Sequence, residues 1–193
     1  DKNGFKGIII GSSGGIDSAL TATIAYDALG SSRVNTVMMP FDYTADMSIE
    51  DAKELAENLS INHSVISLKE IYESFSDVLQ PSFENKEIDK TEENLQSRCR
   101  GVTLMALSNK LGYLVLTTGN KSEAAVGYST LYGDTAGGFS VLKAVSKTLV
   151  YRLSNIRNSK SLVIPERIIE RPPSAELAPD QKDTDSLPDY SIL

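Results

Sequence analysis

The residues with the clearest chemical potential form a short loop, Gly11 to Ser18, with the sequence GSSGGIDS. Its small residues would let backbone N–H groups approach an anion closely, and a helix beginning near Ile16 would direct the positive end of its dipole to the same point. Asp17 adds a carboxylate beside that anion, which is unfavourable unless a cation lies between them. The loop therefore predicts a phosphate site with an adjacent Mg²⁺ ion.

Two well-known phosphate loops do not match this stretch, and a simpler interpretation accounts for part of it. The lysine of a Walker A loop is missing, and the glycines lack the G-x-G-x-x-G spacing of a dinucleotide loop. An ordinary tight turn, with Asp17 as an acid in the first turn of a helix, would also explain the glycines. We favour the phosphate site because the whole loop fits it together.

Few other residue types are available for catalysis. The chain has one cysteine, Cys99, and one histidine, His63, so an internal disulfide, a multi-cysteine metal site and a histidine-rich ligand set are excluded. Cys99 falls on an apolar helical stripe and is expected to be a buried structural thiol. His63 has no visible acid or serine partner. The chemistry must therefore rest on carboxylates, hydroxyls, amides, lysine and arginine.

The elements that would position the loop alternate between strands and helices. Residues 7–10 predict a strand buried on both faces, and the helix that follows starts at Ile16 and stops at Gly30. The alternation continues with strands at 34–39, 63–68 and 113–118, and with helices at 52–59, 71–79 and 91–111. This pattern predicts an α/β fold with a doubly wound, mostly parallel sheet, whose ligands bind beyond the carboxyl ends of the strands.

Three local features complete the pattern. Residues 48–51 resemble a capping box, with Ser48 at the start of a helix. Residues 80–91 are polar and carry no period, so we expect an exposed loop. Five of the seven prolines lie between Pro165 and Pro188, and residues 163–193 are expected to form a proline-rich, solvated tail.

Length, charge and hydropathy narrow the class of protein. A chain of 193 residues with 40% hydrophobic content is expected to form a single domain, 1–193. Its net charge of -7 argues against a nucleic-acid partner, because binding to a phosphate backbone depends on Lys and Arg. No apolar run is long enough for a membrane span, so we expect a cytoplasmic protein. The chain begins at Asp1 rather than Met, and we expect a fragment of a longer protein.

The loop and three further stretches carry a resemblance to a known family. Residues 13–18, SGGIDS, resemble the signature of the N-type ATP pyrophosphatases, or PP-loop enzymes. TEENLQSRCRG at 91–101, TTGNKSEAAVGYSTLYGDTAGG at 117–138 and RPPSAELAPDQKDTDSLPDY at 171–190 look like the synthetase domain of NAD synthetases. The amino-acid sequence of these stretches is more similar to the glutamine-dependent branch of the family, in which a glutaminase domain precedes the synthetase domain.

The resemblance implies an adenine nucleotide alpha hydrolase-like, Rossmann-like fold and the ATP-dependent amidation of deamido-NAD to NAD. In that family the carboxylate of deamido-NAD is adenylated with release of pyrophosphate, and ammonia then displaces AMP. ATP and Mg²⁺ are the implied cofactors, ammonia is free or glutamine-derived, and a homodimer is the implied assembly. The proline-rich segment gains a second interpretation, as a loop over the active site with Lys121 or Lys143 as partners for its acids.

The resemblance also assigns roles to residues of this sequence. The implied catalytic residues are Asp17, Glu123 and Lys147, of which Asp17 and Glu123 would bind Mg²⁺. The implied ATP-binding residues are Gly11, Ser12, Ser13, Gly14, Gly15, Ile16, Asp17, Ser18, Thr118, Lys147 and Ser174. The implied deamido-NAD-binding residues are Asn94, Arg98, Glu123, Tyr128, Ser129, Thr130 and Leu131.

Spacing alone supports only part of this assignment. Asn94 and Arg98 lie four residues apart on one helix face, so they can point together at a phosphate or carboxylate. Glu123 and Lys147 would be interpreted as solvated side chains without the resemblance. The ammonia-only enzymes tend to have a lysine at the position of Leu131, so substrate contacts there are expected to differ.

Other functions share the phosphate loop. GMP synthetases and asparagine synthetases carry it, but they are not expected to carry GNKSE or PPSAELAPDQ. Enzymes that thiolate tRNA usually need a basic surface and paired cysteines, whereas this chain has a net charge of -7 and one cysteine. A non-catalytic nucleotide-binding module with a doubly wound fold is the alternative from a different class.

Overall fold

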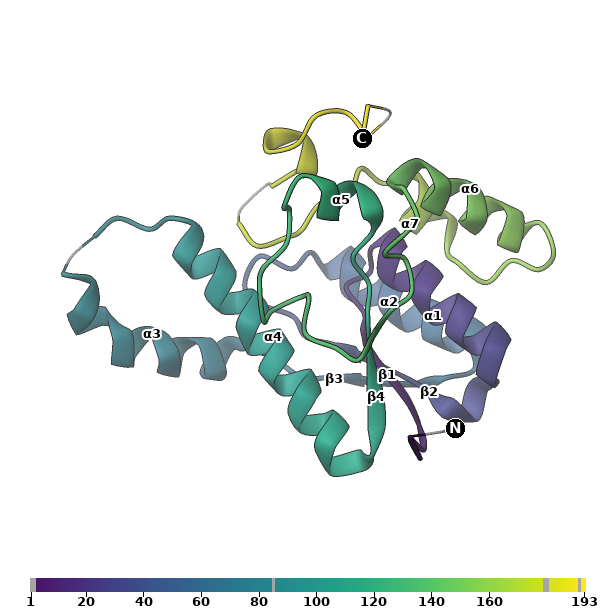
Figure 1. The fold of residues 1–193 in the computed structure, drawn as a ribbon, viewed down its shortest axis with the longest axis horizontal. Helices are drawn as coiled ribbons and strands as arrows, with labels where there is room; N and C mark the ends of the chain where they lie inside the picture. Colours follow the sequence, from purple (N-terminus) through teal and green to yellow (C-terminus); the bar gives the residue numbers. More distant parts are fainter. Residues whose placement is uncertain (1–2, 85, 179–180, 191) are drawn as a thin grey trace.

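A five-stranded sheet forms the centre of the chain, whose computed structural model describes residues 3–84, 86–178, 181–190 and 192–193. The strand order is β3-β2-β1-β4-β5, and each recorded strand pair is parallel. The strands are β1 (Gly7–Gly11), β2 (Val34–Met38), β3 (Asn62–Val65), β4 (Tyr113–Thr117) and β5 (Phe139–Ser140). The doubly wound parallel sheet expected from the sequence is confirmed (Figure 1).

Helices cover both faces of this sheet. They are α1 (Ile16–Leu29), α2 (Asp46–Leu59), α3 (Lys69–Phe83), α4 (Lys90–Leu111), α5 (Lys121–Ala125), α6 (Lys147–Asn158) and α7 (Glu166–Glu170), with short 3-10 helices η1 (Ser31–Arg33) and η2 (Asp183–Asp185). One face packs against α1, α2, α6 and α7, and the other packs against α4.

Strand β1 shows how the sequence builds the two cores. Successive side chains of a strand point to opposite faces, so Ile8 and Ile10 join the core under α1 while Ile9 joins the core under α4. All three are at most 6% exposed, and burying each isoleucine contributes about 1.5–3 kcal/mol. The strand that leads into the phosphate loop is therefore firmly held from both sides.

The order of the strands creates a crevice at the carboxyl edge of the sheet. From β1 the chain crosses to β2 on one side, and β4 lies on the other side, so the winding direction reverses between β1 and β4. Ile10 of β1 pairs with Leu116 of β4, and the segments that follow these strands leave the same edge next to each other. Doubly wound proteins bind ligands at such a switch point.

The predicted capping box at Ser48 is wrong. Helix α2 already begins at Asp46, and among the described residues no side chain caps its N-terminus. Ser48 is instead buried in the first helical turn, where its hydroxyl donates to Glu176 Oε1 at 2.6 Å. The Ser-x-x-Asp spacing fits a capping box, but the Ser48 hydroxyl instead donates to Glu176, which lies far along the chain.

The predicted exposed loop at residues 80–91 is shorter than expected: 84 and 86–89 are outside regular structure and exposed, whereas 80–83, 90 and 91 are helical. Helix α3 continues to Phe83 and includes Pro81 in its last turn, although a proline there removes one backbone hydrogen bond and crowds the carbonyl four residues earlier. Helix α4 starts at Lys90, and Asp89 and Glu92 form its capping box through bonds of 2.7 and 2.8 Å. Residue 85 of this predicted loop lies outside the described residues.

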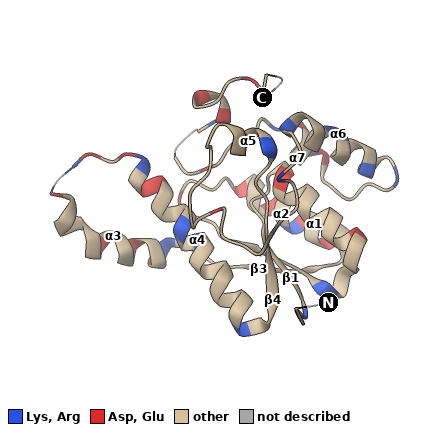
Figure 2. Ribbon diagram, in the orientation of Figure 1, with Lys and Arg blue, Asp and Glu red and all other residues tan. Residues whose placement is uncertain are grey.

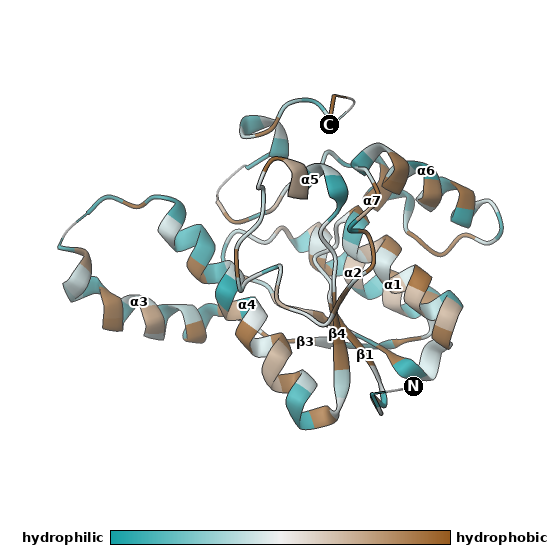
Figure 3. Ribbon diagram, in the orientation of Figure 1, coloured by the Kyte–Doolittle hydropathy of each residue, from teal (hydrophilic) through white to brown (hydrophobic). Residues whose placement is uncertain are grey.

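Helix α3 and the start of α4 project from the body of the molecule (Figure 1). No residue of α3 that the structure describes is buried, yet Ile71, Phe75 and Val78 carry an apolar face along it, visible in brown in Figure 3. Basic residues are distributed over separate elements with acidic residues among them (Figure 2). Among the described residues, no helix combines the length and apolar character that crossing a membrane requires.

Candidate active site

The loop between β1 and α1 is held by its own hydroxyl groups and by a close backbone approach. The N–H of Gly15 donates to Ser13 Oγ at 3.2 Å, and Ser18 Oγ donates to the carbonyl of Gly15 at 2.9 Å. Gly14 has a φ of 75°, and a Cβ there would collide with the backbone of Ser48, so glycine is required. Within the described part of the chain, no side chain caps α1, which leaves first-turn N–H groups for an anion.

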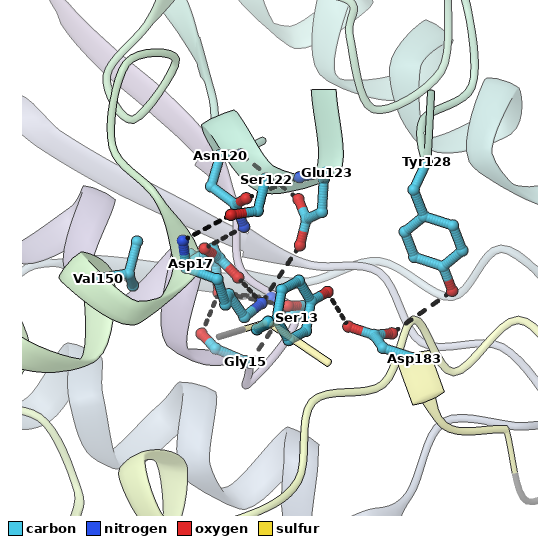
Figure 4. Close-up of polar contacts among 12 residues, drawn as sticks. Ser13, Gly15, Asp17, Asn120, Ser122, Glu123, Tyr128, Val150 and Asp183 are labelled. Carbon is cyan, nitrogen blue, oxygen red and sulfur yellow. Dashed lines mark hydrogen bonds and ion pairs between the residues drawn. The ribbon is translucent and has the colours of Figure 1, made fainter. Parts of the chain in front are cut away.

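Three charged side chains from separate elements meet beside this loop. Lys147, the first residue of α6, places its Nζ 2.5 Å from Asp17 Oδ2 and 3.2 Å from Glu123 Oε1 (Figure 4). Its side chain is only 3% exposed. The backbone N–H of Lys147 donates to Ser122 Oγ at 3.2 Å, which ties the start of α6 to α5. A buried ammonium group is thus enclosed by two carboxylates.

Asn120 orients both carboxylates and was not predicted as a site residue. It is 1% exposed, and its Nδ2 donates to Asp17 Oδ1 at 3.0 Å. Its Oδ1 accepts from the N–H of Glu123 at 3.0 Å and so caps α5. In the sequence it lies three residues after β4, at the edge where ligands bind, and within the GNKSE stretch that resembles the family.

The pKa values of this cluster depart from their ordinary range. Burial and the charge of Asp17 raise the pKa of Glu123 to about 7, against the opposing effect of Lys147. Burial alone would lower the pKa of Lys147, but Asp17 and Glu123 outweigh it and raise that pKa. Lys147 therefore stays charged at neutral pH, whereas Glu123 gains or loses its proton close to neutral pH. Shifts of this kind are typical of functional sites.

A second polar cluster closes the site from the C-terminal side. Asp183 is 3% exposed and accepts from Tyr190 Oη at 2.7 Å and from Tyr128 Oη at 3.4 Å (Figure 4). Burial and the Asp183 carboxylate raise the pKa of both tyrosines, so their hydroxyls remain donors. The ring of Tyr190 lies 5.1 Å from Lys147 Nζ, within the range of a cation–π contact.

A cavity of about 470 Å³ connects these groups, which is a volume suited to a small-molecule ligand. Most residues predicted for the site line it: Gly11, Ser12, Ser13, Gly15, Ile16, Asp17, Ser18, Asn94, Thr118, Glu123, Tyr128, Ser129, Thr130, Lys147 and Ser174. They come from the loop after β1, the segment after β4, two helices and the proline-rich segment. The structure therefore brings together residues that lie far apart in the sequence.

Three predicted residues do not line this cavity: Gly14, Arg98 and Leu131. Gly14 lies against α2, Leu131 is 67% exposed, and the exposed Arg98 donates from Nε to the carbonyl of Leu131 at 3.3 Å. Asn94 lines the cavity and accepts from Thr130 Oγ1 at 2.7 Å. Asn94 and Arg98 thus contact the adjacent residues Thr130 and Leu131, but of the two only Asn94 lines the cavity.

The proline-rich segment lies along the cavity rather than away from the body. Arg171 Nη1 donates to Ser48 Oγ at 2.8 Å and lies 3.5 Å from Glu176 Oε1. Gln96 Nε2 donates to the carbonyl of Leu177 at 3.1 Å. The recorded partner of Glu176 is thus Arg171, not the Lys121 or Lys143 suggested for the acids of this segment. Residues 179, 180 and 191 of this segment lie outside the described residues.

Several residues of the site had no signal in the sequence. Arg100 and Arg171 line the cavity, but each looked like any other surface arginine. Asp183 and Tyr190 stood in a stretch that composition alone assigned to a solvated tail. Packing between segments far apart in the chain brings these four residues to the site, and no local sequence pattern predicts that packing.

The sheet, with a cavity at its switch point, places the chain among the doubly wound α/β proteins that bind ligands at that edge. The chain belongs to the NAD synthase family, whose model, described as NAD synthase, matches residues 1–193. A glutamine-dependent NAD(+) synthetase of Acinetobacter baylyi is 58% identical over 100% of this chain and 36% of its own length. The chain spans about a third of the length of such curated relatives.

Two solved structures are similar over nearly the whole chain. One is glutamine-dependent NAD+ synthetase from Acinetobacter baumannii in complex with ADP, with a TM-score of 0.87 and 52% identity, covering 99% of this chain and 34% of that one. The other is NMN synthetase from Francisella tularensis, with a TM-score of 0.82 and 32% identity, covering 95% of this chain and 73% of that one.

Proposed function

We propose that the chain catalyses the ATP-dependent amidation of deamido-NAD to NAD. The observation that carries this proposal is the convergence of Asp17 and Glu123 on a single cation position beside the phosphate loop. Two carboxylates from separate segments repel each other unless a positive charge lies between them. Such a pair of carboxylates suits a site that must hold charged phosphates and a cation close together.

The phosphate loop would bind the β- and γ-phosphates of ATP. The uncapped N-terminus of α1 and the small residues of the loop suit this role. Thr118, at the end of β4, and Ser174, in the proline-rich segment, line the same cavity and would contact ATP from its two sides. The ADP complex of the Acinetobacter baumannii relative supports a nucleotide in this site.

The donor set at the carboxylates fits Mg²⁺, which binds one or two carboxylates together with phosphate oxygens and water. Asp17 and Glu123 would hold the ion, which would neutralise phosphate charge as pyrophosphate leaves. Among the described residues, no group of three or more His, Cys, Asp or Glu could hold a metal by itself, so the nucleotide and water would complete the shell. Lys147 would then give up at least one of its two ion pairs and turn its charge to the phosphates.

The chemistry would proceed in two substitutions. A carboxylate oxygen of deamido-NAD attacks the α-phosphorus of ATP, the bond to the β-phosphate oxygen breaks, and pyrophosphate leaves. Ammonia then attacks the activated carbonyl carbon, loses a proton, and AMP departs with the oxygen that carried it. The protein's part is to position the reactants and to neutralise charge.

The acceptor would lie against Tyr128, Ser129 and Thr130, which line the cavity from the segment after α5. Asn94 is oriented into the same wall by Thr130. Arg98 and Leu131 lie outside the cavity, so contacts with the dinucleotide would reach them only where it extends beyond that volume. Ammonia would arrive free or from glutamine hydrolysed elsewhere.

A second candidate acceptor is nicotinate mononucleotide. The observation that favours it is the likeness to the Francisella tularensis NMN synthetase, which this chain matches over 73% of that enzyme's length. The two acceptors share the nicotinate carboxylate that is amidated. They differ only in the adenylate half, so the same activating site would serve both.

We also propose that the chain forms one domain, works in the cytoplasm and pairs as a homodimer. The apolar face of α3, where Ile71, Phe75 and Val78 are 37%, 46% and 76% exposed, supports an association through the projecting helices. Light scattering of the chain and of its Phe75→Glu variant would test this. A monomeric wild type would contradict the dimer.

The function is tested by incubating the chain with ATP, MgCl₂ and an ammonium salt and measuring pyrophosphate release with different acceptors. We expect release with deamido-NAD, matched by NAD formation, and none without an acceptor. Xanthosine monophosphate and aspartate serve as negative acceptors for the GMP and asparagine synthetase alternatives. Release only with nicotinate mononucleotide would favour the second candidate, and nucleotide binding without any release would leave a binding module.

A further inference from the structure

The basic side chains that line the cavity differ in how their charges are compensated. They are Lys90, Arg100, Lys147 and Arg171. Lys90 pairs with Glu93 at 2.8 Å, Lys147 pairs with Asp17 at 2.5 Å, and Arg171 lies 3.5 Å from Glu176. Arg100 forms no ion pair with any residue that the structure describes. Among these four side chains, Arg100 therefore has no described carboxylate at ion-pair distance, and Glu176 acts on it only from further away.

Arg100 is nevertheless firmly placed. Its Nε donates to the carbonyl of Met39 at 3.3 Å, just past the carboxyl end of β2. One turn further along α4, Leu104 packs against the start of the phosphate loop, where a Cβ at Gly11 would lie 3.2 Å from Leu104 Cδ1. The backbone bond uses one N–H of the guanidinium and leaves four N–H groups of its fork for another partner.

The surroundings of Arg100 are costly for a cation. Burial lowers its pKa to about 10, and the neighbouring Cys99 and Glu176 offset only part of this effect. The side chain still carries its charge at neutral pH. Arg100 is half-buried, and a partly desolvated charge without a close counter-ion is costly to a fold. Its position in a ligand cavity therefore favours a partner supplied by the ligand.

We infer that Arg100 binds an anionic phosphate oxygen of a nucleotide in this cavity. The guanidinium fork matches phosphate geometry and makes charge-assisted bonds that strengthen away from water. This inference rests on the proposed function only in that a nucleotide occupies the cavity. The phosphate has two sources, the triphosphate of ATP or the pyrophosphate of the dinucleotide acceptor.

The geometry of helix α4 explains why Arg100, and not Arg98, is placed to bind a ligand in the cavity. Arg98, two residues earlier, also donates from Nε to a backbone carbonyl, but it is exposed and does not line the cavity. Residues two positions apart on a helix face different directions. Sequence spacing favoured Arg98 because of its distance from Asn94, whereas the rotation of α4 turns Arg100 inward.

The test is calorimetric titration of the chain with ATP and, separately, with deamido-NAD. The variants are Arg100→Gln, which removes the charge, and Arg100→Lys, which keeps the charge but loses the fork. Lys110→Gln is the control, because it removes one positive charge from α4 at an exposed position that does not line the cavity. Thermal melting of each variant reports whether the fold is retained.

We expect Arg100→Gln to raise the Kd of one ligand by about tenfold or more, with Arg100→Lys in between and Lys110→Gln unchanged. A loss in the ATP titration assigns the contact to the triphosphate, and a loss in the dinucleotide titration assigns it to the acceptor. If Arg100→Gln does not fold, the lysine variant decides alone.

Wild-type affinity of both ligands in the Arg100 variants would overturn the inference, as would a wild type that binds neither nucleotide. These measurements need no turnover. A chain that binds ATP through Arg100 but releases no pyrophosphate would refute the proposed function and leave this inference standing. If the wild type turns over and Arg100→Gln binds both nucleotides with unchanged affinity, the proposed function stands and this inference is refuted.

Discussion

Two regions wall the cavity, and they are held by different interactions. The loop at 11–18 lies between β1, whose isoleucines are buried on both faces of the sheet, and α1, most of which is buried. In the second region, the described residues 171–178 and 181–190 contain only η2 as regular structure. Side-chain hydrogen bonds and ion pairs, such as those of Arg171 and Asp183, hold this second region against the body.

This difference separates the two regions energetically. Changes in the first region act on the apolar core as well as on the site, because loop and core share the same strand and helix. Contacts of the second region contribute about 1 kcal/mol each, so it can loosen while the sheet stays folded. Substitutions in the two regions should therefore give different combinations of lost activity and lost stability.

The largest effect is expected from Asp17→Ala. Loss of this carboxylate removes half of the cation site and leaves Lys147 paired only with Glu123, so pyrophosphate release should fall by about 10³-fold or more. The fold should be retained with a lower melting temperature, because the buried ammonium of Lys147 loses one of its two partners. Asp27→Ala is the matched control, since it removes an acid from the same helix that pairs with Arg157 outside the cavity. Retained turnover in Asp17→Ala would refute the cation site.

The next largest effect is expected from Gly14→Ala, measured by urea unfolding. The variant should lose about 2–3 kcal/mol, because a Cβ at this positive φ meets the backbone of Ser48. Gly112→Ala is the control: it has a φ of 75° in the left-handed region, but the nearest atom to its Cβ, in the Lys6 side chain, lies at 3.7 Å, so it should lose only about 1 kcal/mol. Equal losses would show that the contact with α2 does not constrain the loop.

A smaller effect is expected from Asp183→Asn in the second region. The amide has one acceptor oxygen for two tyrosine hydroxyls and no charge, so the variant should lose about 1–2 kcal/mol and turn over several-fold more slowly. Hydrogen exchange should accelerate at residues 183–190 but not in β1. Asp185→Asn, an exposed neighbour in η2, is the control. Equal acceleration in β1 would contradict the separation of the two regions.

The smallest effect is expected in the pH dependence of the free energy of unfolding. It arises in the sheet and not in either of the two regions that line the cavity. His63 of β3 contacts Thr36 Oγ1 through Nδ1 at 2.9 Å, and burial lowers its pKa. The unfolded chain takes up this proton first as the pH falls below about 6.5, so the free energy of unfolding should decrease in that window. His63→Gln should flatten this dependence in urea titrations, and an unchanged slope would contradict it.

The sequence predicted the parts of the fold whose signals are local. The central strands β1, β2 and β4 and the helix α1 appeared as apolar runs or periods, and Gly30 and Gly112 ended their helices as expected. The extension of α3 through Pro81 was not predicted, because a proline between polar residues is typical of a loop. Helices α6 and α7 were not predicted either, although Leu149, Val150, Leu153 and Ile156 of α6 recur at helical spacing.

The site divides in the same way. Asp17 could be assigned from its own loop, because loop, dipole and carboxylate are contiguous. Glu123 and Lys147 were identified only through resemblance to the family. Arg100 and Asp183 lie in stretches that resemble the family, but no role was assigned to either residue, because their importance depends on which side of a helix faces the cavity and on a segment that returns from the end of the chain.

By itself, the sequence determined a parallel α/β sheet, a glycine-rich loop at the end of its first strand and an acid at the end of that loop. These follow from backbone preferences and side-chain periods, which act over a few residues. The tertiary structure alone decided that Lys147 is shared by two carboxylates, that Asp183 joins two tyrosines over it, and that Arg100 faces the cavity. Such contacts depend on burial and on the low dielectric of the interior, and both arise only when distant segments pack together.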